Sequence, residues 1–170
     1  MAKPSKQGFT LIQLLVVTAI IGLLASIVLV SVNTARRKAR DTRRLADMRT
    51  VVTALELYYD TYQAYPNSDN EGCGGWDTPG DGDFIGTLTT LGLINGKIMD
   101  PTTNIDCGNY FYYKYWAGYA GCDINRGDFY VLGIADMETS GNPHPQSPGW
   151  HCPNADWQAI FEWVTGAFEH

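Results

Sequence analysis

The organisation of this 170-residue chain is decided by one stretch near its start, Gly8-Phe9-Thr10-Leu11-Ile12-Gln13-Leu14-Leu15. The short leader before it carries Lys3 and Lys6, and no further charged residue occurs until Arg36. Leu, Ile, Val and Ala fill most of 9–32. A charged leader that meets an uncharged apolar run at a Gly-Phe junction indicates a processing site at the start of a membrane helix.

The apolar run has the length of a membrane span. At ~1.5 Å per residue, a helix over 9–32 is roughly 36 Å long, against a hydrocarbon core of about 30 Å. A secretory signal peptide is the simpler alternative, but its apolar region covers only about 7–15 residues and ends at a small-residue cleavage site. Here Ala25-Ser26 is followed by more Ile, Val and Leu, so we expect a spanning helix.

The helix is predicted to continue beyond the apolar run. The next apolar residues recur at alternating spacings of three and four, which is the period of a one-sided amphipathic helix. They are Leu45, Met48, Val52, Leu55, Tyr59 and Tyr62. Because no proline lies between Pro4 and Pro66, we expect one helix from about Phe9 to about Tyr62, whose apolar stripe covers a separate globular domain.

The N-terminal residues resemble those of the type IV pilin and type II secretion pseudopilin superfamily. The resemblance rests on the basic leader, on Gly8-Phe9-Thr10-Leu11-Ile12, and on the long apolar run with Gly22 inside it. It implies cleavage between Gly8 and Phe9 by a membrane prepilin peptidase and N-methylation of the new Phe9 amine. It also implies self-assembly into a helical filament, driven by an assembly platform and motor, after a period as a single-pass precursor in the cytoplasmic membrane.

Gln13 departs from the family pattern, which has glutamate at this position. In the family, the glutamate is thought to attract the terminal amine of a neighbouring subunit. An amide keeps an acceptor oxygen but loses the charge that roughly doubles the strength of such a hydrogen bond. We expect Gln13 to pair with the Phe9 amine of a neighbour; a position at the lipid headgroup boundary is the alternative. Whether the lost charge marks a major subunit or a minor tip subunit stays open.

The chain is predicted to have an α+β fold in four segments. They are a leader over 1–8, a transmembrane and assembly helix over 9–32, its amphipathic continuation over 33–65, and a globular extracellular domain over 66–170. Aromatic and β-branched residues predict antiparallel strands at 110–116 and 129–134. A short helix over 84–91 should stop at Gly92. The aromatic spacing over 157–168 fits a helix, with a strand over 159–164 as the alternative.

Charge is strongly segregated along the chain. Residues 36–49 carry a net charge of +5, whereas 50–170 carry −13 and the whole chain −6. We expect the basic segment to be solvated or to face lipid headgroups and acidic surfaces of neighbouring subunits. Direct nucleic-acid binding is not expected, because the acidic remainder repels phosphate. The positive-inside rule alone would place this segment in the cytoplasm. The family resemblance implies a position outside, and we follow it because the Gly8 junction is the more specific signal.

Four cysteines, all beyond the apolar run, indicate an oxidising exterior and two disulfides. Three pairings are open to four cysteines. We favour Cys107 with Cys122, because they flank one predicted strand and its return, and therefore Cys73 with Cys152. A zinc site is disfavoured, because the sequence has no Cys-x-x-Cys pair.

The acidic turn that contains Asp77, Asp81 and Asp83 resembles part of a calcium loop, because oxygen ligands at alternating positions suit a hard cation. The terminal glutamate of the full pattern is absent. Solvated acidic turns are the simpler interpretation, so we expect no cofactor and keep calcium as the one candidate.

The sequence indicates a structural protein and not an enzyme. No Gly-x-Ser-x-Gly or His-Glu-x-x-His motif is present, and the three histidines all fall in the last 27 residues. The tyrosines and tryptophan of 110–116 predict a buried sheet face, with a sugar- or base-stacking platform as the alternative. We expect a subunit of a type IV pilus-like surface filament. The alternatives are a type II secretion pseudopilin and a monomeric membrane-anchored surface-binding domain.

Overall fold

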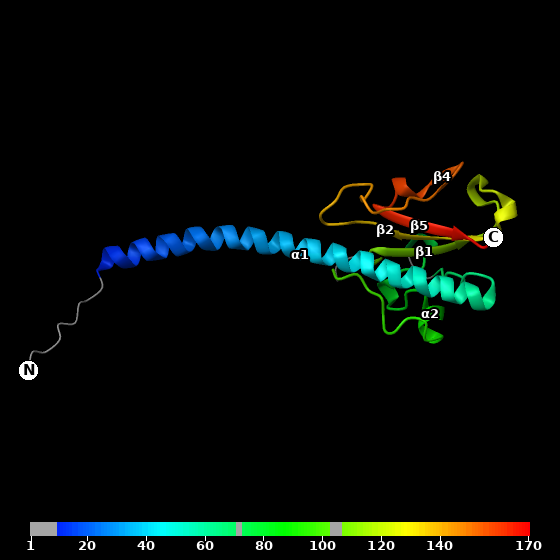
Figure 1. Cartoon of the computed structure of the whole chain (residues 1–170), viewed down its shortest axis with the longest axis horizontal. Helices are drawn as coiled ribbons and strands as arrows, with labels where there is room; N and C mark the ends of the chain where they lie inside the picture. The colour runs from blue at the N-terminus through cyan, green and yellow to red at the C-terminus, as the bar shows by residue number, and fades with distance from the viewer. Residues whose placement is uncertain (1–9, 71–72, 103–106) are drawn as a thin grey trace, which may run out of the picture. The chain divides into compact units, whose positions relative to one another are not determined.

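The computed structural model describes residues 10–70, 73–102 and 107–170. Its first element is the long helix α1, Leu11–Tyr62, and this confirms the continuous helix that the sequence predicts. Figure 1 shows α1 as one continuous helix. By its contacts the chain divides into two compact units, of which one ends at Arg37 and the other begins at Lys38. With a helix, an antiparallel sheet and two disulfides, the fold is α+β, as predicted.

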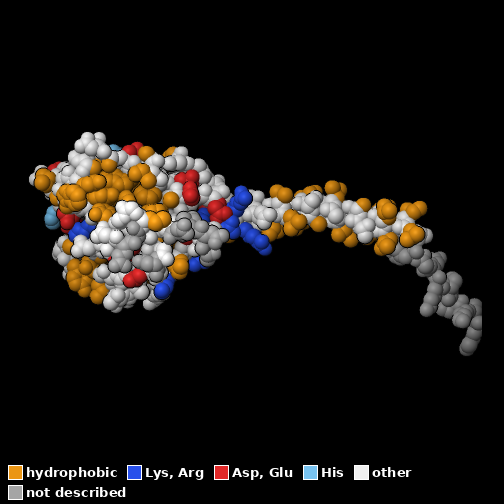
Figure 2. Space-filling view, turned by 180° about the vertical axis from the view of Figure 1, so that it is seen from behind, with side chains coloured by type: hydrophobic (Ala, Val, Ile, Leu, Met, Phe, Trp, Pro, Cys, Tyr) orange, Lys and Arg blue, Asp and Glu red, His pale blue; other side chains and the backbone are white. Residues whose placement is uncertain are grey.

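Over residues 11–32 of the first unit, α1 is apolar on every side, and its side chains are exposed in this structure. Leu11 is 85% exposed and Leu23 is 65% exposed. Figure 2 shows hydrophobic side chains along the whole of this helical segment. Among the residues that the structure describes, α1 is the one helix that is long and apolar enough to cross a membrane. Side chains that would be unfavourable in water are favourable in lipid or against other apolar helices.

The second unit is built on a three-stranded antiparallel sheet. Its strands are β1 (Tyr110–Tyr115), β2 (Phe129–Ile134) and β5 (Trp163–Phe168), in the order β1-β2-β5. The predicted strands at 110–116 and 129–134 are confirmed. The helical interpretation of 157–168 is wrong, and the strand begins at Trp163 instead of 159. The misleading aromatic spacing arises because Trp157 and Phe161 lie before the strand and are buried by packing against the sheet.

One face of the sheet packs against the second half of α1, as the predicted stripe requires. Met48 and Leu55 are fully buried there, and Leu45, Val52 and Tyr59 are partly buried. The buried apolar stripe of α1 is broader than the predicted one and ends before Tyr62. Val51 and Ala54 are also buried, whereas Tyr62, the last residue of α1, is 51% exposed. The sheet contributes aromatic and aliphatic partners from all three strands: Tyr110, Tyr112, Tyr130, Leu132, Ile134 and Trp163.

The opposite face of the sheet is also covered, which the sequence did not indicate. A small hairpin of β3 (His151–Cys152) and β4 (Ala155–Asp156) and the residues after it form this second layer. Glycines in the sheet allow the layer to lie close. A Cβ at Gly133 would come within 2.6 Å of the Phe161 ring, and one at Gly166 within 2.6 Å of the Trp150 ring.

The predicted short helix is confirmed as α2, Gly86–Thr90. It stops at Gly92, which has a positive φ of 71° and whose N–H donates to the Thr89 carbonyl at 3.0 Å. The left-handed conformation required there costs glycine little. Five single turns of 3-10 helix complete the described elements: Cys73–Gly75, Pro79–Asp81, Tyr119–Gly121, Ile124–Arg126 and Trp157–Ala159.

The two disulfides join Cys73 to Cys107 and Cys122 to Cys152, so the predicted pairing is wrong. The reason is the length of β1. Cys107 precedes this six-residue strand and Cys122 follows it, so the two lie towards opposite ends of an element that is roughly 20 Å long. Each cysteine instead pairs with a loop or hairpin that lies at its own end of the strand, with Cα–Cα distances of 5.5 and 5.0 Å.

Candidate processing and assembly sites

The predicted processing site, Gly8 and Phe9, lies outside the described residues. Cleavage between them, methylation of the Phe9 amine and the pairing of that amine with Gln13 therefore stay predictions. The described part of the site begins at Thr10, the residue before the first turn of α1.

Thr10 and Gln13 hydrogen-bond to each other at the start of α1. The backbone N–H of Thr10 donates to the Gln13 side-chain oxygen at 3.0 Å, and the backbone N–H of Gln13 donates to the Thr10 hydroxyl at 3.3 Å. This reciprocal pair is a capping box, which satisfies two N–H groups that the helix itself leaves without partners. Gln13 thus has a partner in its own chain. The Thr-x-x-Gln spacing is a readable signal that the sequence analysis missed.

The second unit holds a cluster of charged residues around Arg44. This side chain is only 2% exposed, although sequence alone places it in a solvated basic segment. Its guanidinium donates to Asp100 at 2.6 and 3.1 Å, to Asp41 at 2.8 Å and to Glu138 at 3.2 Å. Arg40 adds a bidentate pair with Glu138 at 2.6 and 2.5 Å. The expectation of a fully solvated basic segment is therefore wrong for these two arginines.

Asp41 joins the same cluster to the chain after β2. Its carboxylate accepts the backbone N–H groups of Glu138 at 2.9 Å and Thr139 at 2.8 Å. Asp41 and Arg44 lie one turn apart on α1, so the cluster attaches one segment of the helix to two separate loops. Charges buried this deeply require partners, because removing an ion from water costs several kcal/mol.

Hydrogen bonding keeps the buried carboxylates ionised. Burial opposes the charge of Asp100, but hydrogen bonds from Arg44, Thr102 and Asn109 outweigh burial and lower its pKa to about 2. For Asp41, burial likewise acts to raise the pKa, and the hydrogen bonds from Glu138, Thr139 and Arg44 lower it below the ordinary value. The cluster is therefore fully charged at neutral pH.

Acidic residues also meet in a cavity of about 490 Å³, where Asp69, Asp77 and Asp83 lie among the lining residues. One Asp77 carboxylate oxygen accepts the backbone N–H of Ile85 at 3.0 Å. The Asp81 side chain lies outside the described part of the chain. Within 10–70, 73–102 and 107–170, no group of three or more histidine, cysteine or acidic residues is arranged to hold a metal ion. Solvated acidic turns stay the expectation here, with calcium as the one candidate ligand.

The aromatic residues of β1 belong mainly to the interior. Tyr110 and Tyr112 are fully buried against α1, and Tyr115 is 8% exposed on the opposite face. The predicted buried aromatic face is therefore confirmed, and these three rings cannot form a stacking platform. Trp116, just after the strand, is 61% exposed.

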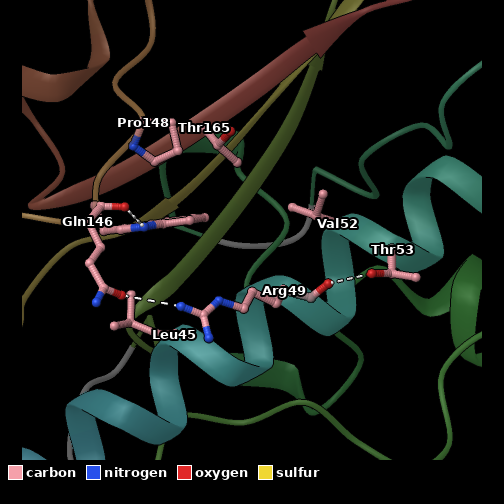
Figure 3. A pocket seen from close by; sticks show the side chains of 8 residues that line it. Leu45, Arg49, Val52, Thr53, Gln146, Pro148 and Thr165 are labelled. Carbon is pink, nitrogen blue, oxygen red and sulfur yellow. Dashed lines mark hydrogen bonds between the residues drawn. The ribbon is translucent and has the colours of Figure 1, made fainter.

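An apolar groove of about 350 Å³ runs between α1 and the sheet in the second unit. Leu45, Arg49, Val52 and Thr53 of α1 form one wall (Figure 3). The other wall consists of Gln146, Pro148, Trp163 and Thr165. Arg49 reaches across the groove and donates to the Gln146 side-chain oxygen at 3.3 Å.

Comparison with known proteins gives one family model and several relatives that match part of the chain. The prokaryotic N-terminal methylation motif matches residues 3–29. The type II secretion system core protein G of Pseudomonas aeruginosa is 34% identical over 68 residues, which cover 40% of this chain and 48% of that protein. The same component of Vibrio cholerae is 36% identical over 70 residues, covering 41% of this chain and 48% of that protein.

A pilus protein is also among the relatives. The type IV wide pilus major component PilA4 of Thermus thermophilus is 37% identical over 62 residues, which cover 36% of this chain and 47% of that protein. The chain thus spans about half the length of the curated relatives it matches. No solved structure matches the chain. By its methylation motif and its apolar N-terminal helix, the chain is similar to both type II secretion core protein G and a type IV pilus component.

Proposed function

We propose that this chain is a structural subunit of a filament, processed between Gly8 and Phe9 and polymerised through the apolar part of α1. The observation that carries the proposal is the exposed apolar helix of the first unit, most of which lies within the methylation motif matched over residues 3–29. Such a helix can leave lipid for a bundle of like helices without exposing apolar surface to water. Packing between helices, together with an assembly platform and motor, would then decide the direction of this exchange.

The first candidate is a type IV pilus-like filament on the cell surface. It agrees with the two disulfides of the second unit, because disulfides persist in oxidising exterior compartments. In this proposal the four segments 1–8, 9–32, 33–65 and 66–170 act as leader, membrane and assembly helix, amphipathic continuation and exterior domain. Before assembly, the precursor would be inserted in the cytoplasmic membrane, where the prepilin peptidase and methylase act on it. The chain itself would have no catalytic role.

The second candidate is a pseudopilin of a type II secretion system. A specific observation favours it, because several of the relatives are named as the core protein G of such systems. Both candidates require the same helix and the same processing.

Mass spectrometry of the native subunit tests the proposal. We expect a mature chain that begins at Phe9, with one methyl group on its amine and two disulfides. An unprocessed N-terminus that retains Lys3 and Lys6 would contradict filament assembly and favour a membrane-anchored binding domain. Deleting the gene then separates the two candidates: loss of surface filaments by electron microscopy supports the pilus, and loss of exported proteins with surface filaments intact supports the pseudopilin.

A further inference from the structure

Two surface features of the second unit, both on α1, are not accounted for by packing within the described chain. The first is the apolar groove beside Leu45 and Val52, with Arg49 at its rim. The second is a ridge near the end of α1, which we define as Glu56, Leu57 and Asp60. All three residues of the ridge are exposed, and Leu57 is 52% exposed.

The charges of the ridge are unfavourable within a single chain. Glu56 and Asp60 are like charges four residues apart, a spacing at which they repel each other on a helix surface. They also lie at the C-terminal end of α1, where the helix dipole favours cations, and the last turn of α1 contains no basic residue. Glu56 accepts a hydrogen bond from the Tyr65 hydroxyl at 3.3 Å. The Asp60 carboxylate has no ion pair with the residues that the structure describes.

We propose that the ridge of one copy docks into the groove of the next copy, with Arg49 facing the carboxylates of Glu56 and Asp60. The occupant is a second copy of this chain because the two surfaces are complementary. The ridge offers an apolar side chain beside two anions, and the groove offers apolar walls beside one cation. The inference rests on the proposed function, since it describes a contact between filament subunits.

The positions along α1 define how the two copies are displaced. Arg49 lies seven residues before Glu56 and eleven before Asp60, which at ~1.5 Å per residue are offsets of roughly 10 and 16 Å. When one copy is displaced along the helix axis by seven to eleven residues, its Leu57 lies at the height of residues 46–50 of the other copy, beside the groove. Unshifted parallel copies would instead place Arg49 level with Arg49. The single N-terminal apolar run excludes antiparallel copies, because all copies start from one membrane in one orientation.

A contact between two different surfaces of the same chain leaves one of each unused, so it can repeat without limit. The groove of the first copy and the ridge of the last remain open for further subunits. The docking surface therefore suits a filament, whereas a self-complementary patch would produce a closed dimer.

Photo-crosslinking in the full-length chain tests the docking. A photoreactive amino acid replaces Leu57, filaments are irradiated, and the crosslinked peptides are identified by mass spectrometry. We expect crosslinks between copies to Leu45–Thr53 or to Gln146–Thr165, where the walls of the groove lie. Crosslinks to other surfaces of the second unit would overturn the docking. The complete absence of filaments and of crosslinks between copies would instead refute the proposed function.

Charge reversal provides a second, independent measurement. We expect Arg49→Asp and Asp60→Arg each to lower filament yield at least threefold at equal subunit levels in the membrane. The double variant should recover yield to within twofold of the unchanged protein. Arg43→Asp is the matched control: Arg43 is exposed on another side of the same helix and should change yield less than twofold. A double variant no better than either single variant contradicts the docking.

Discussion

The two halves of α1 are one helix with opposite relations to their surroundings. Residues of 11–32 are apolar on every side and exposed in the described structure, whereas those from Lys38 onward have one buried side and one charged side. Among the described residues the first half has no buried side chain, so we expect its stability to depend on lipid or on other copies. The second half has its partner, the sheet, in the same chain. The same helical geometry thus supports packing against the sheet in one half and an exposed apolar surface in the other. The pattern of side chains distinguishes the two halves.

The largest effect is expected at the charge cluster of the second half. Arg44→Met removes the cation that pairs with Asp41 and Asp100 and leaves two buried carboxylates uncompensated. Breaking a buried ion pair in this way costs about 3–5 kcal/mol. Thermal unfolding of the full chain in detergent measures the loss. Arg43→Met, one residue away and with its side chain 61% exposed, should cost less than about 0.5 kcal/mol; equal losses would contradict the role of the cluster.

The two halves should also respond differently to the same truncation. Leu55→Ala opens a cavity in the core between α1 and the sheet, and should lower the free energy of unfolding of the second unit by about 3 kcal/mol. Leu23→Ala, in the exposed apolar half, should leave that value within about 0.5 kcal/mol of its original level. Chemical denaturation followed by tryptophan fluorescence reports on the second unit, where all five tryptophans lie. A large effect of Leu23→Ala would show that the halves are energetically coupled.

Acid should weaken the second half. The pKa of Asp100 is about 2 in the folded chain, against an ordinary value of 3.8. Because the folded value is the lower one, the contribution is fully present above the ordinary pKa and is lost as the pH falls towards 2. It amounts to about 2 kcal/mol. Unfolding measured between pH 5 and pH 2 should show this loss.

The variant Asp100→Asn provides the control for the acid experiment. It no longer titrates in this range, so its stability should be lower at neutral pH but should change less between pH 5 and pH 2. An unaltered pH slope in this variant would rule out Asp100 as the source of the acid sensitivity.

The smallest effect is expected at the start of the first half. Thr10→Val and Gln13→Ala should each destabilise the first turn of α1 by about 1 kcal/mol, and the double variant should cost little more than either, because both break one capping box. Hydrogen exchange of the first-turn amides in lipid bilayers measures this. A strong assembly defect of Gln13→Ala with no effect of Thr10→Val would instead favour pairing of Gln13 with a neighbour's Phe9 amine.

Much of the fold can be predicted from sequence because helix and strand patterns are local. The alternating stripe from Leu45 to Tyr59 and the β-branched and aromatic runs of β1 and β2 each depend on periodicities that a short segment displays by itself. The strand β5 was harder to predict, because Trp157 and Phe161 imitate a helical spacing while they fill the second face of the sheet. That layer depends on where the chain returns, which no short segment shows.

The candidate sites also differ in whether the sequence alone reveals them. The methylation motif and the apolar run can be recognised as strings of residues, whereas the burial of Arg44 cannot. Seven cations lie between Arg36 and Arg49, and nothing in their order distinguishes Arg44 from Arg43. Only the positions of Asp100 and Glu138, which are 56 and 94 residues further along the chain, select it.

The sequence by itself therefore determined the membrane-length helix, the processing motif and the main elements of the α+β fold, because each depends on residue type and spacing along a few turns or strands. The tertiary structure alone decided the disulfide pairing, the buried arginine, and the groove and ridge on α1. Each of these depends on which distant segments come together, and the six-residue strand β1, which separates Cys107 from Cys122, shows how one element of ordinary length changes such pairings.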